Sequence, residues 1–291
     1  MKIIRYFLEF FIVLIFFIIF KVIGVKLSSD LGEIIGKYFG PLFRKKTIAK
    51  KNILIAFPDL NEKSINEMID SMWKNIGRIF GEYIHINKFS IIDPKKIKIV
   101  FANKNNFEML KKNNKPVVFF SGHFANFELM AKCLQELGFN IGAIYRPLNN
   151  IFLNPIMEFI RKKYICPIQI EKGSNGTKKL IKHISTNRPL ALMIDQRLSS
   201  SIRVPFFNQP ATTTTTPAQL AIKYDALLVP VFLKRLEKTN FEFFIEEPLI
   251  INRTSDYDKD IFNITQIMNK KIEEFIKRDP AHWLWSHDRW K

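Results

Sequence analysis

Only two cysteines, Cys133 and Cys166, occur among the 291 residues of this chain. Two cysteines cannot supply the network of cross-links found in small secreted domains, and they fit a reducing compartment. Each lies in a segment that reads as a helix or a strand, so we interpret both as core thiols. His282 and His287 lack a convincing third ligand, and we therefore expect no metal site.

The sequence also lacks the short motifs of several enzyme classes. It contains neither the Gly-x-Ser-x-Gly elbow of serine hydrolases nor the glycine-rich loops of nucleotide-binding enzymes. Acidic residues are few, 27 against 45 basic ones, and the net charge of +18 favours anionic partners such as lipid head groups, phosphorylated substrates or an acidic carrier protein. Nucleic acid is an alternative partner, but the basic residues are spread along the chain without a binding motif, so we expect none.

The N-terminal segment is strongly apolar. Tyr6–Phe20 contains one charged residue, Glu9, and with its neighbours it approaches the ~20 residues that a helix needs to span a bilayer. We predict a membrane anchor at residues 1–26, and a buried core helix is the alternative. Arg5 and Lys21 crowd the segment, so it either crosses the bilayer or lies in its interface. More basic residues follow the anchor than precede it, which predicts a cytoplasmic body.

A basic, helical region is expected at residues 27–95. Leu27–Phe43 has helical apolar spacing, and lysines and arginines cluster directly behind it. Such a cluster beside an anchor is typical of contact with anionic head groups, although an ordinary solvated face has the same composition. Asn61–His85 predicts a further helix with one apolar stripe.

Strands alternate with helices across residues 96–291. Pro116–Phe120 (PVVFF) is a continuous apolar run, which is typical of a strand buried on both faces, and Leu190–Ile194 (LALMI) has the same character. Leu227–Leu233 and Phe241–Ile245 predict the two arms of a hairpin. This alternation predicts an α/β catalytic domain with a mainly parallel central sheet flanked by helices.

Two residues at the end of the PVVFF strand suggest acid–base chemistry, because reactions in parallel sheets occur at the carboxyl ends of the strands. His123 follows the strand, and Glu128 is expected in the first turns of the next helix. The carboxylate could hold one imidazole nitrogen and leave the other free to accept a proton, which predicts a general-base pair. The alternative is a histidine that caps the helix or hydrogen-bonds within the core.

Other polar residues are expected at the same edge of the sheet. Arg146 ends the next strand, Arg161 lies in the helix after it, and Asp195, Gln196 and Arg197 end the LALMI strand. Because a guanidinium pairs with phosphate in a bidentate geometry, several converging arginines predict an anionic substrate. Each arginine taken alone is more typical of a surface salt bridge.

Several longer segments together resemble the lipid A late acyltransferases, the lauroyl and myristoyl transferases of lipopolysaccharide synthesis within the glycerolipid acyltransferase superfamily. The resemblance is carried by SGHFANFELM, YRPLNN, DQR, VPFFNQPATTTTTPAQLA, LVPVF and HWLWSHDRW. In that family a His-x4-Asp/Glu pair is the catalytic dyad, which implies catalytic roles for His123 and Glu128. The family's other motifs match Arg146, Asp195 and Gln196. The unbroken threonine run and the arginine after Asp-Gln depart from the family pattern and concern substrate detail more than chemistry.

The resemblance implies an enzyme of the bacterial inner membrane with its catalytic domain on the cytoplasmic face. It would transfer a fatty acyl chain from acyl carrier protein to a hydroxyl of a lipid A precursor, without a metal or other cofactor. His123 would take the hydroxyl proton and Glu128 would orient the imidazole, while Asn126 or backbone donors stabilise the oxyanion. The alternatives are an acyltransferase for another phospholipid or glycolipid acceptor and a noncatalytic, membrane-tethered basic binding protein.

Overall fold

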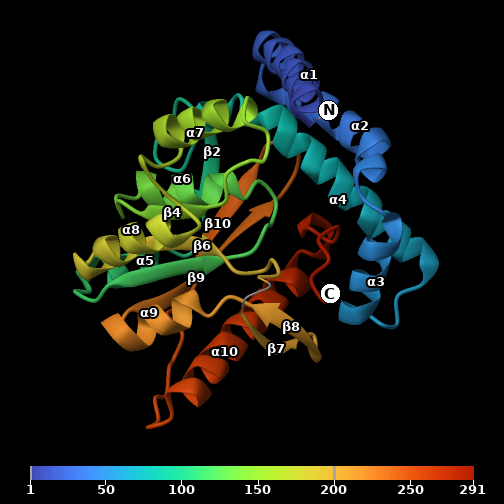
Figure 1. The fold of residues 1–291 in the computed structure, drawn as a ribbon. Coiled ribbons are helices and arrows are strands. Elements are labelled where there is room, and N and C mark those ends of the chain that lie inside the picture. Colours follow the sequence, from blue (N-terminus) through green and yellow to red (C-terminus); the bar gives the residue numbers. More distant parts are fainter. Residues whose placement is uncertain (1, 199–200) are drawn as a thin grey trace.

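Eight strands form the central sheet of the computed structural model, which describes residues 2–198 and 201–291 (Figure 1). In order across the sheet they are β1 (Phe89–Ser90), β2 (Ile97–Phe101), β10 (Phe241–Ile245), β9 (Leu227–Arg235), β3 (Val117–Ser121), β6 (Leu190–Met193), β4 (Gly142–Tyr145) and β5 (Ile168–Glu171). Strands β9 and β10 pair antiparallel, as the predicted hairpin requires, and the other neighbours in this order pair parallel. The predicted α/β architecture with a mainly parallel sheet is confirmed.

The two faces of the sheet carry separate apolar clusters. Alternate side chains of β3 point to opposite faces, so Val118 and Phe120 join one cluster and Phe119 joins the other. Cys133 and Cys166 are both buried in the second cluster, which confirms that they are core thiols. The first cluster is covered by α8 (Ser174–Ser185), α9 (Thr216–Tyr224) and α10 (Tyr257–Arg278), and the second by α5 (Lys104–Lys112), α6 (Glu128–Glu136) and α7 (Leu153–Tyr164).

Four helices precede the sheet: α1 (Lys2–Ile23), α2 (Val25–Phe43), α3 (Lys46–Ala56) and α4 (Glu62–Tyr83). Helix α1 is long and apolar enough to cross a membrane, with a mean hydropathy of 2.6 and 11% of its most apolar window buried. Phe17 and Phe20 are its buried residues, and both pack against Phe80 of α4. Most of its other apolar side chains are exposed, which is consistent with membrane association.

A seam of glycines joins α2 to α4. A Cβ atom on Gly32 would lie 2.2 Å from the carbonyl oxygen of Gly77, and one on Gly36 would lie 2.2 Å from that of Trp73. Only glycine therefore permits this close approach of the two backbones. Arg78 of α4 also pairs with acidic side chains of α2, so the two helices form one packed unit.

Several local features differ from the sequence-based expectations. Strand β1 extends the sheet into the region expected to be wholly helical, and α3 is an additional helix where only a basic cluster was expected. A separate hairpin of β7 (Ile202–Phe206) and β8 (Gln209–Thr213) takes up the first part of the threonine run. Helix α9 begins at Thr216, at the end of the threonine run, and no side-chain hydrogen bond caps it. Two short 3-10 helices, η1 (Ile86–Lys88) and η2 (Pro280–His282), complete the described elements.

Candidate active site

His123 lies in a tight loop between β3 and α6. The helix begins at Glu128, so residues 123–127 are irregular. Ala125 has a φ of 46°, a left-handed conformation that a residue with a side chain rarely adopts, and its N–H donates to the carbonyl of His282 at 3.1 Å. The loop therefore has a fixed course that depends on a segment near the C-terminus.

Asp195 holds the imidazole of His123. One carboxylate oxygen lies 2.7 Å from Nδ1, and the other accepts the backbone N–H of His123 at 2.8 Å. Trp283 donates its indole N–H to the same second oxygen at 2.8 Å. Burial alone would raise the pKa of Asp195, but the charge of His123 and these hydrogen bonds lower it to about 2. An ionised Asp195 favours a proton on Nδ1, which leaves Nε2 as the acceptor.

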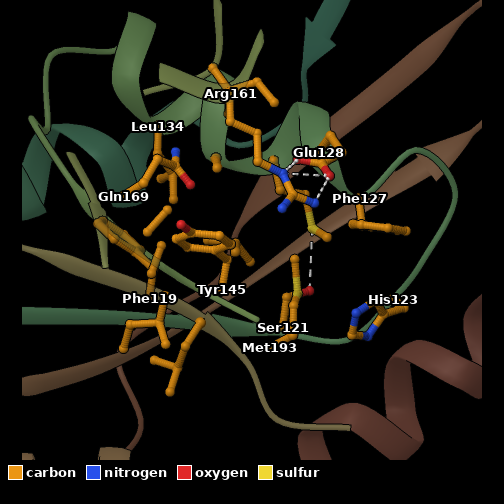
Figure 2. A pocket seen from close by; sticks show the side chains of 18 of the residues that line it. Phe119, Ser121, His123, Phe127, Glu128, Leu134, Tyr145, Arg161, Gln169 and Met193 are labelled. Atoms are coloured by element: carbon orange, nitrogen blue, oxygen red, sulfur yellow. Dashed lines mark hydrogen bonds and ion pairs between the residues drawn. The ribbon is translucent and has the colours of Figure 1, made fainter. Parts of the chain in front are cut away.

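Glu128 has a different partner from the predicted one. Its carboxylate pairs with the guanidinium of Arg161, whose Nε lies 3.1 Å from Oε1, and the guanidinium also lies over the Tyr145 ring (Figure 2). Burial would lower the pKa of Arg161, but the charge of Glu128 raises it above the ordinary value. The expectation that Glu128 orients the His123 ring is therefore corrected, because β6 lies beside β3 and brings Asp195 to that position.

Asn126 is also placed differently from the prediction. Its side chain is 1% exposed, and its amide group donates to Glu82 at 2.8 Å. Because that donor is already engaged and faces the interior, the proposed contact of Asn126 with an oxyanion is corrected to a structural role.

A buried ion pair is linked by hydrogen bonds to the loop that carries His123. Glu82 of α4 and Arg235 of β9 are 0% and 4% exposed, and Arg235 donates to both carboxylate oxygens, at 2.6 and 3.1 Å. Arg235 also donates to Asn75, whose amide in turn donates to the carbonyl of Ala125 at 3.2 Å. This network fixes the backbone just after His123. Its members lie on elements that are distant in the sequence, so no local pattern could reveal it.

A cavity of about 270 Å³ opens beside His123 on the α6–α7 face of the sheet. Figure 2 shows His123 at one end and Phe119, Leu134 and Gln169 at the other, with Glu128 and Arg161 between them on one side. The inner wall is mainly apolar, and the following residues contribute to it: Phe119, Met130, Ala131, Leu134, Ala143, Ile165, Ala191, Met193 and Val231. Such a lining suits an alkyl chain whose reactive end lies near His123.

The remaining predicted residues divide into two groups. Arg146 and Gln196 line the cavity, and the Gln196 amide nitrogen lies 3.4 Å from Nε2 of His123. Arg197 does not line it: its side chain is exposed, and its backbone N–H donates to His287 at 2.9 Å. Within residues 2–198 and 201–291, no group of three or more histidine, cysteine or acidic side chains is placed to hold a metal ion.

The C-terminal aromatic residues belong to the site rather than to a membrane surface. Trp283 and Trp285 are 1% and 0% exposed, so both pack in the core. Trp283 also fixes Asp195 through its indole N–H, a contact that sequence reasoning missed. The sequence indicated only that Trp283 lies within the HWLWSHDRW segment. Its partner, Asp195, could be identified only from the fold.

Comparison with known proteins identifies relatives of the whole chain. A family model for bacterial lipid A biosynthesis acyltransferase matches residues 1–291. A lipid A biosynthesis acyltransferase of Haemophilus influenzae is 26% identical over 268 residues, covering 88% of this chain and 83% of the relative. The lipid A biosynthesis palmitoleoyltransferase and lauroyltransferase of Escherichia coli are 25% and 23% identical, covering 90% and 91% of this chain and 84% of each relative.

The comparison with solved structures also gives a match. The crystal structure of a 1-acyl-sn-glycerophosphate acyltransferase from Thermotoga maritima covers 85% of this chain and 96% of its own, with a TM-score of 0.37 and 11% sequence identity. The match of the family model over the full length decides the assignment. The chain belongs to the bacterial lipid A biosynthesis acyltransferase family.

Proposed function

We propose that this chain transfers a fatty acyl group from acyl carrier protein to a hydroxyl of a lipid A precursor. The single observation that carries the mechanism is the His123 ring at the opening of the apolar cavity, with Nδ1 held 2.7 Å from Asp195. The cavity provides room for an alkyl chain, and the ring provides a base where that chain would end.

His123 is the general base in this proposal. Its Nε2 accepts the proton of the acceptor hydroxyl, and the resulting alkoxide forms a bond to the thioester carbonyl carbon of the donor. Collapse of the tetrahedral intermediate breaks the carbon–sulfur bond, and the proton on His123 passes to the leaving thiolate. Asp195 stabilises the imidazolium that exists between these steps, and a positioned base of this kind contributes about 10²–10⁴-fold.

Glu128 acts through Arg161 in this scheme. The ion pair lines the cavity near His123, and Glu128 holds the guanidinium while its remaining N–H groups stay available. A fixed guanidinium is suited to stabilise the negative charge that develops on the thioester oxygen. Arg146, exposed at the same cavity, is suited to bind an acceptor phosphate.

Charge and hydropathy support the proposed donor and location. A net charge of +18 favours an acidic carrier protein and anionic membrane lipids. Exposed apolar side chains of α1 suit insertion in the bacterial inner membrane, and the basic residues that follow α1 favour a catalytic domain on the cytoplasmic face.

Acyl transfer by the purified full-length protein tests the proposal. We expect acylation of a lipid A precursor with acyl carrier protein as donor, and a loss of about 10²–10⁴-fold for His123→Ala with unchanged expression and melting temperature. A lysophospholipid serves as the competing acceptor, and an acyl-coenzyme A thioester serves as the competing donor. Preferred turnover of either one would overturn the corresponding part of the proposal, and near-normal turnover by His123→Ala would overturn the mechanism.

A further inference from the structure

A second cavity, of about 740 Å³, lies between the sheet and helices α8 and α9. Its lining includes Ile170, Ile144 and Leu192, which belong to the apolar cluster on that face, and the last two reach the first cavity as well. Ala143 and Ala191, on the other face, line only the first cavity. The volume lies within the range typical of ligand pockets. The mechanism proposed above leaves this cavity unused.

The lining of this second cavity is amphipathic. Leu180 of α8 and Leu220 of α9 are buried and complete the apolar floor. The rim is polar, and the residues that contribute to it are Glu171, Lys172, Thr177, Thr216, Gln219 and Lys223. Within the described lining, the two lysines outnumber the one carboxylate, so the rim favours an anionic group. An apolar floor with a cationic rim suits an alkyl chain that carries a negatively charged head group.

The two cavities meet at the edge of the sheet where His123 lies. Strands β4 and β6 pair with each other at Gly142 with Leu190 and at Ala143 with Ala191, and within the described residues they form no later pair with each other. The residues that line both cavities lie at or just after the carboxyl ends of β4, β5 and β6: Ile144, Lys172, Leu192 and Met193. A molecule in the second cavity would therefore have its polar end beside the opening of the first.

We propose that the second cavity binds an acyl chain of the lipid acceptor, while Lys172 and Lys223 hold the acceptor's anionic head group. This inference rests on the proposed acyl transfer, which requires two alkyl chains to enter one protein with their polar ends together. The donor chain then occupies the α6–α7 face and the acceptor chain the α8–α9 face. The sheet keeps the two chains apart, and the acceptor hydroxyl reaches His123 at the shared edge.

Two neighbouring residues of α8 allow a test in which a bulky side chain is placed either inside or outside the cavity. Thr177 is exposed and lines the cavity, and Lys178 is exposed but does not line it. Thr177→Trp should raise the KM for the lipid A precursor about tenfold, a change of about 1.4 kcal/mol, and leave the KM for acyl carrier protein within about twofold. Lys178→Trp should change neither constant. An equal rise in both constants for Thr177→Trp, or a rise confined to the donor, would overturn the inference.

A reversal of charge at the rim of the cavity gives a second, independent test. Lys223→Glu should raise the acceptor KM by a similar factor, because it places a carboxylate beside the anionic head group, while Lys178→Glu should not. Phosphatidylglycerol vesicles added to the assay distinguish the acceptor from an ordinary anionic lipid. Inhibition by these vesicles that is competitive with the acceptor and lost in Lys223→Glu would assign the cavity to membrane phospholipid instead.

A binding measurement separates this inference from the proposed reaction. The probe is dodecyl phosphate, and the full-length protein is kept in dodecyl maltoside. This detergent has the same alkyl chain as the probe but a neutral head group, so any added effect of the probe comes from its anionic head group. Dodecyl phosphate should raise the Tm of the wild type and of Lys178→Trp in a concentration-dependent way, and Thr177→Trp should lose that increase. An equal increase in all three proteins would overturn the cavity assignment. Absence of acyl transfer by the wild type would instead overturn the proposed function.

Discussion

Asp195 contacts His123 twice, through one oxygen at 2.7 Å from the ring Nδ1 and through the other at 2.8 Å from the backbone N–H. The two contacts fix both the rotation of the ring and the position of the residue that carries it. Because Trp283 and the His123 amide share the second oxygen, the carboxylate itself cannot turn without losing hydrogen bonds.

Asp195→Asn is expected to lower kcat by about 10²–10⁴-fold with a small change in KM. An asparagine amide that donates to Nδ1 would leave the proton on Nε2, and the ring could no longer accept the substrate proton. Steady-state kinetics and circular dichroism together check this result. Asp59→Asn, an exposed residue in a turn, is the control. Activity within a few-fold of wild type for Asp195→Asn would mean that the carboxylate has only a packing role.

Double-mutant kinetics can separate the two carboxylates near His123. Residues that act as one unit give non-additive losses, so His123→Ala combined with Asp195→Asn should be scarcely worse than His123→Ala alone. Glu128→Gln acts through Arg161, so its loss should multiply with that of His123→Ala. If the Glu128 double variant were no worse than His123→Ala, Glu128 and His123 would form the single dyad that the family resemblance implies.

His287 should make the protein sensitive to acid. Burial, opposed in part by Asp195 and helped by Arg289, lowers the pKa of His287 to about 4, and its Nε2 accepts the Arg197 N–H. The folded pKa lies below the unfolded value of about 6.5, so the unfolded chain binds the proton more tightly. This contribution to stability is complete above pH 6.5 and falls as the pH drops toward 4.

The expected size of this acid effect is about 1–2 kcal/mol, reduced from the full pKa difference because the ring is partly exposed. Melting curves of the wild type and of His287→Gln at pH 7.5 and pH 4.5 check it. The difference in Tm between the two proteins should change in favour of His287→Gln at the lower pH. A difference that is independent of pH would show that His287 does not titrate in this range.

The seam between α2 and α4 should tolerate no side chain. Gly36→Ala places a Cβ atom 2.2 Å from the Trp73 carbonyl, so the helices must separate. We expect a loss of about 2–3 kcal/mol, which is typical of overpacking, and a lower Tm in detergent. Lys37→Ala, on the exposed side of the same helix, should leave the Tm unchanged within about 1–2 °C. Equal Tm values for both variants would mean that the seam can open without cost.

Local signals in the sequence were sufficient for much of the fold. The run Val117–Phe120 of β3 is apolar at every position because both faces of that strand are covered, and such a run is visible without knowledge of its neighbours. The hairpin of β7 and β8 was missed for a local reason. Its two-residue turn consists of Phe207 and Asn208, both with positive φ, and phenylalanine is an unusual residue for that conformation.

The site was only partly predictable because its contacts depend on strand order. His123 and Asp195 are 72 residues apart, and no periodicity reveals that β3 and β6 are neighbours. Glu128, five residues after His123, was the obvious candidate from spacing. The left-handed turn at Ala125 and the start of the helix at Glu128 direct the two side chains to different partners. The carboxylate that pairs with a histidine in a loop is therefore poorly identified from sequence proximity alone.

Helix α4 has two attachments, and together they restrict how the enzyme can move. One side of the helix is locked to α2 through the glycine seam and bears the packing of α1, while Glu82 and Asn75 on the same helix hold the backbone beyond His123. A tilt of α1 and α2 would therefore be transmitted through α4 to the loop that carries His123. With α1 in the membrane and His123 as the base, as proposed, this connection would hold Nε2 at one height above the bilayer, and a lipid acceptor would have to present its hydroxyl at that height.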